Sequence, residues 1–298
     1  MSGFIIFLVI TLIAWIWWAN KAVKRTDIFL RDSRIPQAFC NFKIAHISDF
    51  HNTDLGQSNQ KLLSMLRGAA PDMIAITGDL VESRRTDMRI AMDFIRKAAD
   101  VAPVYYVTGN HESRIEAYMD LEKQMRQAGV NVLRDESALW ERDGVFLRIV
   151  GLDDPSFTLS RDRWGETAEL VEARLKRLIG GERLYTILLS HGPELFGSYQ
   201  ACQADLILCG HAHGGQIRLP LLGGVIAPGQ GWFPRFTSGV YEEGCAKMAV
   251  SRGIGNSLFP FRINNRPEVV VLTMMNRAQQ EEKENVKWKS VKSEGPLK

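Results

Sequence analysis

The chain has 298 residues, of which 45% are hydrophobic and 24% are charged, so it can bury a core in one large domain or two small ones. Its formal net charge of +3 at pH 7 is too small to indicate a nucleic-acid partner, and we expect none. The four cysteines show no Cys-x-x-Cys spacing, which favours free thiols and a reducing compartment over a disulfide framework.

Residues 4–19 carry no charge and read FIIFLVITLIAWIWWA. As a helix they would span about 24 Å, and the neutral residues at either end could complete a hydrocarbon core of about 30 Å. Tryptophans near one end are typical of an interfacial belt, and basic residues follow from Lys21 onward. A cleaved signal peptide is the alternative, but basic residues do not precede the run and no small-x-small site follows it. We expect residues 1–25 to be an uncleaved single-pass anchor of the cell membrane with its basic flank, and the remaining chain to be cytoplasmic.

Residues 26–42 are expected to form a linker, although the part from Arg31 onward could also be an edge strand. Strand-like apolar runs follow at 43–48, 73–77 and 104–108, and each ends in a short polar motif. Helical patterns over 59–68, 87–99 and 113–127 come after them, the last with Ser113 as its expected N-cap. This alternation predicts parallel strands with polar groups at their carboxyl ends.

The second half of the chain changes character. Short strands over 132–133, 138–141 and 145–150 predict a hairpin region, and a polar loop over 153–164 leads to a helix over 167–179. Apolar runs at 184–189 and 204–208 again end in histidine motifs. Residues 219–241 predict a loop system rich in Gly, Pro and aromatic residues, before closing strands at 247–251 and 268–274. The charged tail, 276–298, is expected to be flexible.

The polar motifs together supply two carboxylates, one amide and five imidazoles: Asp49, His51, Asp79, Asn110, His111, His191, His211 and His213. Such nitrogen and oxygen ligands suit a borderline divalent ion, Mn²⁺, Fe²⁺ or Zn²⁺. The set is too large for one ion, and two ions that share a carboxylate could hold a bridging hydroxide and clamp an in-line phosphoryl displacement. A structural role is the default interpretation of each histidine alone, but not of all five at strand ends. His46 and Cys209, by contrast, are expected to be core residues.

Five of these motifs resemble, in order and spacing, those of the calcineurin-like metallophosphoesterases: Asp49-x-His51, Gly78-Asp79, Gly109-Asn110-His111-Glu112, His191 and Gly210-His211-x-His213. The later segments Ser251-Arg252-Gly253 and Asn265-Arg266-Pro267-Glu268 are similar to the bacterial membrane-associated phosphodiesterase branch. The resemblance implies an α/β fold, a four-layer α/β/β/α sandwich over residues 43–275, behind the N-terminal transmembrane helix.

The same resemblance implies roles for individual residues. Asp49, His51 and His213 would hold one ion, and Asn110, His191 and His211 the other. Asp79 would bridge the two ions, and His111 would stabilise charge and act as general acid. Glu112 and Asp153 could orient imidazoles, and surface roles are the alternative for both. Phosphate could be bound by three arginines, Arg252, Arg262 and Arg266, for which ordinary surface pairing is the alternative.

These expectations add up to a membrane-anchored phosphohydrolase with two divalent metal ions that cleaves phosphoesters, preferentially diesters. The anchor and the apolar 219–241 loop favour a lipid-linked or membrane-proximal substrate. A pyrophosphatase acting on a nucleotide-linked lipid precursor is one alternative, and a non-catalytic metal-binding membrane scaffold is another. No tyrosine follows Asp79 closely, which disfavours the iron–tyrosinate chemistry of purple acid phosphatases. The oligomeric state stays open.

Overall fold

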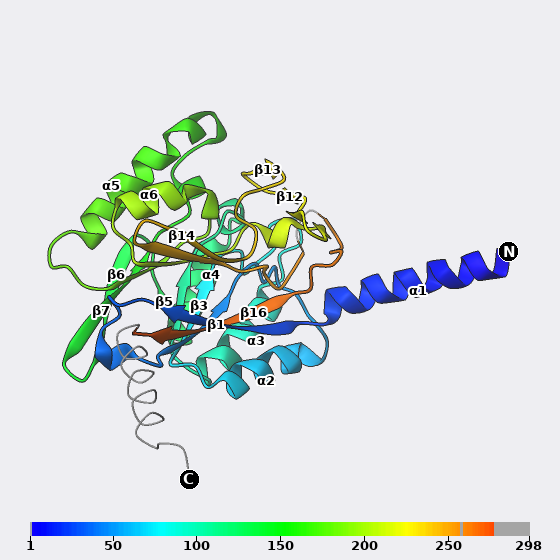
Figure 1. Ribbon diagram of the computed structural model, residues 1–298, viewed down its shortest axis with the longest axis horizontal. Coiled ribbons are helices and arrows are strands. Elements are labelled where there is room, and N and C mark those ends of the chain that lie inside the picture. Colours follow the sequence, from blue (N-terminus) through cyan, green and yellow to red (C-terminus); the bar gives the residue numbers. More distant parts are fainter. Residues whose placement is uncertain (1, 257–258, 277–298) are drawn as a thin grey trace, which may run out of the picture.

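The computed structural model describes residues 2–256 and 259–276. Within this part of the chain, two six-stranded sheets lie between two groups of helices (Figure 1). In Figure 1, α2 and α3 cover one side of the pair of sheets, and α5 and α6 cover the opposite side. This arrangement confirms the predicted four-layer α/β/β/α sandwich.

The first sheet has the order β1-β16-β2-β3-β4-β5, in which β2 to β5 are parallel and β16 runs antiparallel to β2. Its strands are β1 (Lys24–Arg31), β2 (Lys43–Ile47), β3 (Met73–Thr77), β4 (Val104–Val107), β5 (Asn131–Val132) and β16 (Glu268–Met275). Three amphipathic helices bury their apolar faces on it: α2 (Gln60–Ala69), α3 (Met88–Ala99) and α4 (Tyr118–Gln127).

The second sheet has the order β14-β15-β9-β8-β7-β6, with β7, β8, β9 and β15 parallel to one another. Its strands are β6 (Glu136–Arg142), β7 (Val145–Gly151), β8 (Thr186–Leu189), β9 (Leu206–Cys209), β14 (Gly239–Glu243) and β15 (Ala246–Val250). It is covered by α5 (Thr167–Ile179) and α6 (Phe196–Ala201).

The core consists of three apolar layers. One lies between the first sheet and its helices, one between the second sheet and its helices, and the third between the sheets. In the middle layer, Ile44 and Ala75 of the first sheet pack with Ile187 and Leu208 of the second, all fully buried. Both sheets are therefore covered on both faces, which explains why their central strands are continuous apolar runs. His46 and Cys209 are fully buried, as predicted.

Two predictions about local structure were wrong. Lys24–Arg31, placed partly in a linker, form β1, which pairs in parallel with β16 along its whole length. That pairing joins segments about 240 residues apart, so no local pattern could reveal it. The third helix begins at Tyr118 rather than at Ser113, because Glu112–Arg114 form a separate 3-10 turn and the Ser113 hydroxyl donates to the carbonyl of Asn110.

The predicted 219–241 loop system contains two short hairpins, and single 3-10 turns connect other elements. The hairpins pair β10 (Arg218–Leu219) with β11 (Gly223–Gly224) and β12 (Ile226–Ala227) with β13 (Gly231–Trp232). The 3-10 turns are Gln37–Phe39, Gln57–Asn59, Glu112–Arg114, Pro155–Phe157, Arg161–Glu166, Pro193–Leu195 and His213–Gly215. The tail predicted to be flexible lies, beyond Asn276, outside the described residues.

The helix α1 (Ser2–Lys21) projects from the sandwich as an isolated rod (Figure 1). Its large apolar side chains are exposed, for example Phe4 at 68% and Ile13 at 61%. Among the described residues, Gly3–Lys21 is the one helical stretch long and apolar enough to cross a membrane. An apolar surface of this kind needs a cover other than water.

Candidate metal centre

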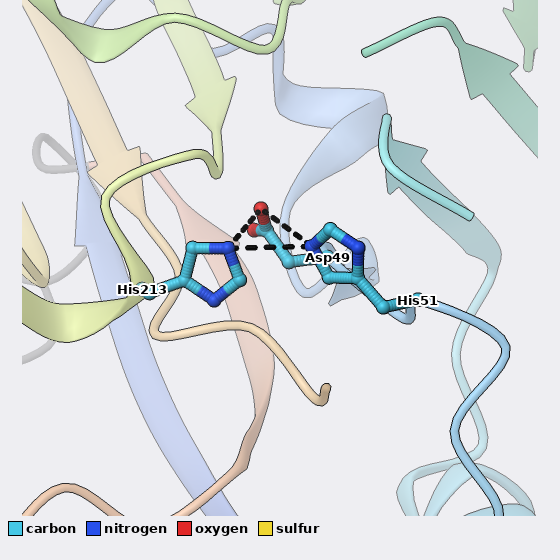
Figure 2. Close-up of side chains that lie close together, drawn as sticks. All are labelled: Asp49, His51 and His213. Carbon is cyan, nitrogen blue, oxygen red and sulfur yellow. Dashed lines mark hydrogen bonds and ion pairs between the residues drawn. The ribbon is translucent and has the colours of Figure 1, made fainter. Parts of the chain in front are cut away.

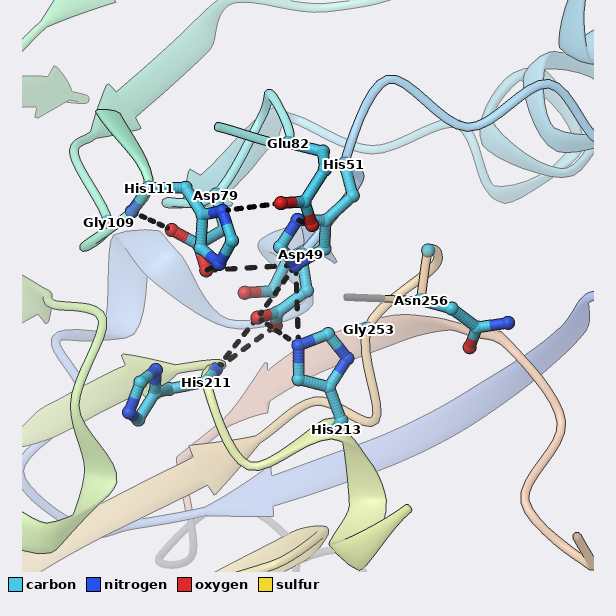
Figure 3. Close-up of polar contacts among 12 residues, drawn as sticks. Asp49, His51, Asp79, Glu82, Gly109, His111, His211, His213, Gly253 and Asn256 are labelled. Carbon is cyan, nitrogen blue, oxygen red and sulfur yellow. Dashed lines mark hydrogen bonds and ion pairs between the residues drawn. The ribbon is translucent and has the colours of Figure 1, made fainter. Parts of the chain in front are cut away.

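The polar motifs follow the carboxyl ends of five strands, and packing of the two sheets brings these ends together. The first sheet supplies its residues after β2, β3 and β4, and the second after β8 and β9. Figure 3 shows the strand-end residues gathered around Asp49. The structure thus brings together all eight predicted residues of the centre: Asp49, His51, Asp79, Asn110, His111, His191, His211 and His213.

The backbone at these strand ends is strained. Five of the eight residues have positive φ: Asp49 (49°), His51 (48°), Asp79 (51°), His211 (63°) and His213 (46°). A non-glycine residue in this region costs on the order of 1–2 kcal/mol. Such strain persists where surrounding structure fixes it, and it concentrates at functional sites.

Two glycines permit the close approach of the two sheets here. Gly210 packs against the side chains of Ser48 and Asp49 so tightly that an added Cβ would overlap both. At Gly78 (φ 83°), which follows β3, a Cβ would lie 2.7 Å from Nδ1 of His191, which follows β8 of the second sheet. Side chains at these positions would push the two sets of ligands apart.

The first group of converging atoms comes from Asp49, His51 and His213 (Figure 2). Nε2 of His213 lies 3.4 Å from Oδ1 of Asp49 and 3.3 Å from Nε2 of His51. All three side chains are buried. One proton at most can lie between the two facing Nε2 atoms of His51 and His213. A cation bound between them could instead accept the lone pairs of both nitrogens.

The second group comes from Asp79, His191 and His211. Nε2 of His191 lies 3.2 Å from Oδ2 of Asp79 and 3.1 Å from Nδ1 of His211. The other ring nitrogen of His191 is 2.8 Å from the Thr77 carbonyl, which fixes the proton on Nδ1 and turns the Nε2 lone pair toward the group. The Asn110 amide also reaches this point, with one terminal atom 3.0 Å from Nδ1 of His211.

Asp79 lies between the two groups. Its Oδ1 accepts a hydrogen bond from the backbone N–H of His111 at 2.8 Å. Its Oδ2 is 3.2 Å from Nε2 of His191 and 3.7 Å from Nε2 of His51. One carboxylate oxygen therefore faces a histidine of each group, as the predicted bridging role requires.

These donor sets fit a pair of divalent ions. Each group offers imidazole nitrogens with carboxylate or amide oxygens, a combination suited to borderline metals. The carboxylates are already biased toward their charged form. Burial opposes ionisation of Asp79, but His191, His51 and His111 outweigh it and hold the pKa of Asp79 well below its usual value.

His111 contacts the centre from its edge. Its Nδ1 accepts the backbone N–H of Ser83 at 3.1 Å, so a neutral ring carries its proton on Nε2. That Nε2 lies 3.9 Å from Oδ2 of Asp79. Burial lowers the pKa of His111 to about 4, although Asp79 and Glu82 oppose this shift. The neutral ring thus directs an N–H donor toward the centre.

Glu82 is a site residue that the sequence reasoning missed. Its carboxylate oxygens lie 3.4 Å from Nδ1 of His51 and 3.2 Å from Nδ1 of His111. Burial would raise the pKa of Glu82, but these two histidines hold it at about 2. The available signal was the position of Glu82 three residues after Asp79. A loop that leaves a strand can turn back toward the strand end and so bring Glu82 to the centre.

The orienting roles predicted for Glu112 and Asp153 were wrong in detail. Glu112 accepts the backbone N–H groups of Asp79 (2.9 Å), Val81 (3.2 Å) and Gly109 (2.7 Å), and so holds the two loops together. Asp153 pairs with Arg134 at 2.7 Å and with the Thr108 hydroxyl. Both carboxylates satisfy loop and side-chain donors other than imidazoles, because buried N–H groups near them need acceptors.

The three predicted phosphate-binding arginines have different surroundings. Arg262 is buried, donates to the carbonyls of Arg252 and Gly255, and has Nη2 3.3 Å from Nδ1 of His213. Nε of Arg252 lies 3.5 Å from Oε2 of Glu268. Arg266 donates to the Ala22 carbonyl and stacks on Trp18 at the end of α1. A substrate role stays a prediction for all three, and Arg266 would have to leave these contacts to fulfil it.

Two cavities flank the centre. One, of about 330 Å³, is bordered by His213 and by apolar residues that include Ile226, Pro228 and Phe259. The other, of about 180 Å³, is bordered by Asn110 and His211. A ligand of each group therefore borders its own cavity, and Gly229 borders both cavities.

Comparison with known proteins identifies a family and several relatives to which the chain is similar. Residues 42–215 match the model of the calcineurin-like phosphoesterase family. The chain is 30% identical over 257 residues to the "Uncharacterized metallophosphoesterase YkuE" of Bacillus subtilis, and the match covers 85% of each protein. It is 28% identical to the "Phosphodiesterase YaeI" of Escherichia coli, with 86% of this chain and 88% of that protein covered.

Two further similarities are more distant. The "Transmembrane protein with metallophosphoesterase domain" of Danio rerio is 26% identical, over 86% of this chain and 58% of that protein. Among solved structures, TT1561 of Thermus thermophilus has a TM-score of 0.50 at 17% sequence identity, and the match covers 71% of this chain and 89% of that one. The second similarity supports the fold alone.

Proposed function

The chain belongs to the calcineurin-like phosphoesterase family of metal-dependent phosphoester hydrolases, and from this premise we propose that it is a membrane-anchored phosphodiesterase with two metal ions. The observation that carries the proposal is the position of Asp79, whose Oδ2 faces His191 of one ligand group and His51 of the other. Mn²⁺, Fe²⁺ or Zn²⁺ would suit these donors equally.

In this proposal Asp49, His51 and His213 hold one ion, and Asn110, His191 and His211 hold the other, with Asp79 shared. When bound, such a pair of ions supplies a nucleophile at neutral pH and stabilises the charge of an in-line phosphoryl displacement. Water provides the oxygen that becomes bonded to phosphorus, and the bond from phosphorus to the leaving alcohol breaks. A diester thereby becomes a monoester and an alcohol, and the leaving oxygen gains a proton.

His111 is the residue we assign to the charge that develops on substrate oxygen. Its Nε2–H points into the centre because Ser83 occupies Nδ1. A neutral imidazole can donate a hydrogen bond there, as a preorganised donor that needs no rearrangement during the reaction. Full proton transfer to the leaving oxygen, the general-acid role predicted from the resemblance, belongs to the same proposal.

The two flanking cavities favour a diester over a small monoester. A phosphodiester carries a substituent on each side of phosphorus, and the spaces beside His213 and beside Asn110 could take one each. A monoester would leave one of them without an occupant. The lining beside His213 is mostly apolar, which suits an apolar substituent.

The substrate we propose is lipid-linked or lies at the membrane surface. Support comes from α1, with its exposed apolar side chains, and from the 219–241 loop system, where Leu222 is 66% and Trp232 is 71% exposed. The basic residues that follow α1 favour a cytoplasmic position of the sandwich.

The test uses the full chain in detergent micelles, stripped of metal and then supplied with Mn²⁺. The full chain is needed because β1 begins at Lys24, so removal of the predicted anchor and its basic flank, residues 1–25, would cut into this strand. Hydrolysis of bis(4-nitrophenyl) phosphate is compared with that of the corresponding monoester, with Asp79→Asn as the inactive reference. We expect metal-dependent turnover of the diester in excess of the monoester, and none in Asp79→Asn. A protein that binds two Mn²⁺ ions per chain and cleaves neither ester would overturn the proposal in favour of the scaffold.

A further inference from the structure

A third cavity, of about 450 Å³, connects the end of α1 with the metal centre. We call it the α1 cavity. Trp17 and Lys21 border it on the side of the helix, and His51 and Glu82 border it on the side of the centre. Its volume falls within the range of about 300–1,000 Å³ that is usual for small-molecule sites. One space is therefore shared by the boundary of the apolar helix and by a predicted metal ligand.

The end of α1 is fixed to this cavity by hydrogen bonds. Oδ1 of Asn20 accepts from the backbone N–H of Arg262 at 2.8 Å and from the side-chain amide of Asn256 at 3.1 Å. The Asn20 amide donates to the Arg262 carbonyl at 3.1 Å, and Nζ of Lys21 donates to the carbonyl of Asp54 at 2.6 Å. The same Arg262 lies against His213, so one buried residue joins the helix end to the centre.

The walls of the α1 cavity change character along its length. At the outer end Trp17, 68% exposed, continues the apolar surface of α1. Tryptophan at the end of an apolar helix is typical of the level of lipid headgroups. Two cationic side chains, Lys21 and Arg85, border the cavity together with the carboxylates of Asp54 and Glu82. An anionic group would be favoured beside the two cations. The inner end is formed by His51, where chemistry is proposed to occur.

We propose that the α1 cavity binds the headgroup of an anionic phospholipid diester that remains in the membrane, with its acyl chains beside α1. This inference rests on the proposed function and specifies how the substrate reaches the centre. Because Asn20 fixes the helix end, the headgroup region of the bilayer and the ligands stay at a constant separation. The lipid does not have to be extracted from the bilayer, which spares the exposure of its acyl chains to water.

The first test is competition in vesicles that contain the full chain. Bis(4-nitrophenyl) phosphate is the reporter substrate, and the vesicles contain either phosphatidylcholine alone or phosphatidylcholine with phosphatidylglycerol. We expect phosphatidylglycerol to raise the apparent KM of the reporter without a change in kcat. Lys21→Ala/Arg85→Ala should weaken this competition by about fivefold or more, because each cation near an anionic surface contributes about 1 kcal/mol.

The matched control is Arg25→Ala/Lys61→Ala, which removes two positive charges that do not border the cavity. Arg25, like Lys21, belongs to the basic segment at the end of α1. It should retain the full competition. An unchanged KM with phosphatidylglycerol would overturn the proposal, as would an equal effect of both double variants. Failure of the proposed function is distinguishable, since it would abolish metal-dependent reporter turnover in every vesicle.

A second test needs no turnover. Phosphatidylglycerol with a photoactivatable diazirine in its headgroup is irradiated in vesicles with the full chain, and adducts are mapped by mass spectrometry. We expect adducts on Trp17, Asn20 or Lys21, or on residues 52–55, all of which border the α1 cavity. Adducts restricted to residues 226–231, beside His213, would show that the headgroup binds in the apolar cavity instead and would overturn the proposal.

Discussion

The two sheets make unequal contributions to one centre. The first sheet supplies both carboxylates, Asp49 and Asp79, together with His51, His111 and Asn110. The second sheet supplies imidazoles alone: His191, His211 and His213. Each of the two ligand groups assigned to an ion nevertheless needs both sheets, because Asp49 and His51 meet His213, and Asp79 meets His191 and His211. A further cluster of possible ligands, His51, Glu82 and His111, lies on the first sheet alone.

This division means that neither sheet supplies all the ligands of either of these two groups. The negative charge sits on one sheet and most of the neutral nitrogen ligands on the other, so the groups become complementary only when the middle apolar layer packs. Burial of Asp49 and Asp79 would be costly without the imidazoles that face them. Packing of the sheets and assembly of the centre are therefore one event.

The largest effect should come from Asp79→Asn, which alters the one carboxylate that faces both groups. The amide removes a negative charge next to His191 and His51. We expect diester hydrolysis to fall by about 10³-fold or more and the metal content to drop below two ions per chain. Asp120→Asn, at an exposed site on α4, serves as the control. Activity within tenfold of the parent protein would show that Asp79 does not serve both ligand groups.

His111→Gln tests the contribution that the first sheet makes without binding metal. We expect hydrolysis to fall by about 10²–10⁴-fold while both ions remain bound, because the side chain acts on substrate and not on the ligand groups. Activity assays are combined with metal analysis of the same sample. Loss of an ion in this variant would show that His111 is a metal ligand. It would then no longer differ in role from the four histidines proposed as ligands.

Glu82→Gln should have an intermediate effect. The carboxylate of Glu82 lies 3.4 Å from Nδ1 of His51 and 3.2 Å from Nδ1 of His111, so it contacts site residues of the first sheet only. Loss of such a supporting carboxylate typically costs about 10–100-fold in metal affinity or activity. Titration with Mn²⁺ measures the affinity, and Glu116→Gln, at an exposed position, is the control. Equal behaviour of the two variants would exclude an orienting role.

The smallest effect is expected on stability. Ions that join the two sheets should stabilise the folded chain by about 3 kcal/mol at a metal concentration of 100 Kd. For a chain of this size that corresponds to an increase in Tm of about 5 °C. Thermal unfolding with Mn²⁺ and with chelator measures the shift, and Asp79→Asn should lose most of it. A shift of the same size in Asp79→Asn would indicate binding elsewhere.

Much of the sandwich could be predicted from local patterns. The apolar runs at 73–77 and 104–108 coincide with β3 and β4 to within one residue, and the predicted helix over 167–179 matches α5. The reason is that strands buried on both faces are uniformly apolar and that Gly or polar residues follow them directly. The start of α4 was missed because Ser113 has the chemistry of an N-cap yet bonds to Asn110 and Ser156 instead.

The centre could be predicted as a set of residues but not as a geometry. The eight side chains come together as expected because parallel strands deliver their ends to one edge. The contacts of Glu82, Glu112 and Arg266 could not be foreseen. Each depends on a segment distant in sequence or on a loop conformation: the two histidines for Glu82, three amides for Glu112, and the end of α1 for Arg266.

The sequence by itself determined which residues can carry the chemistry, because ligand type and position after an apolar strand are local properties. It also determined the apolar character of residues 4–19. Only the tertiary structure decided that β1 pairs with β16, that each ligand group draws on both sheets, and that a cavity joins Trp17 to His51. These features arise from contacts between segments up to about 240 residues apart, and such contacts are set by packing of the whole chain and not by any local pattern.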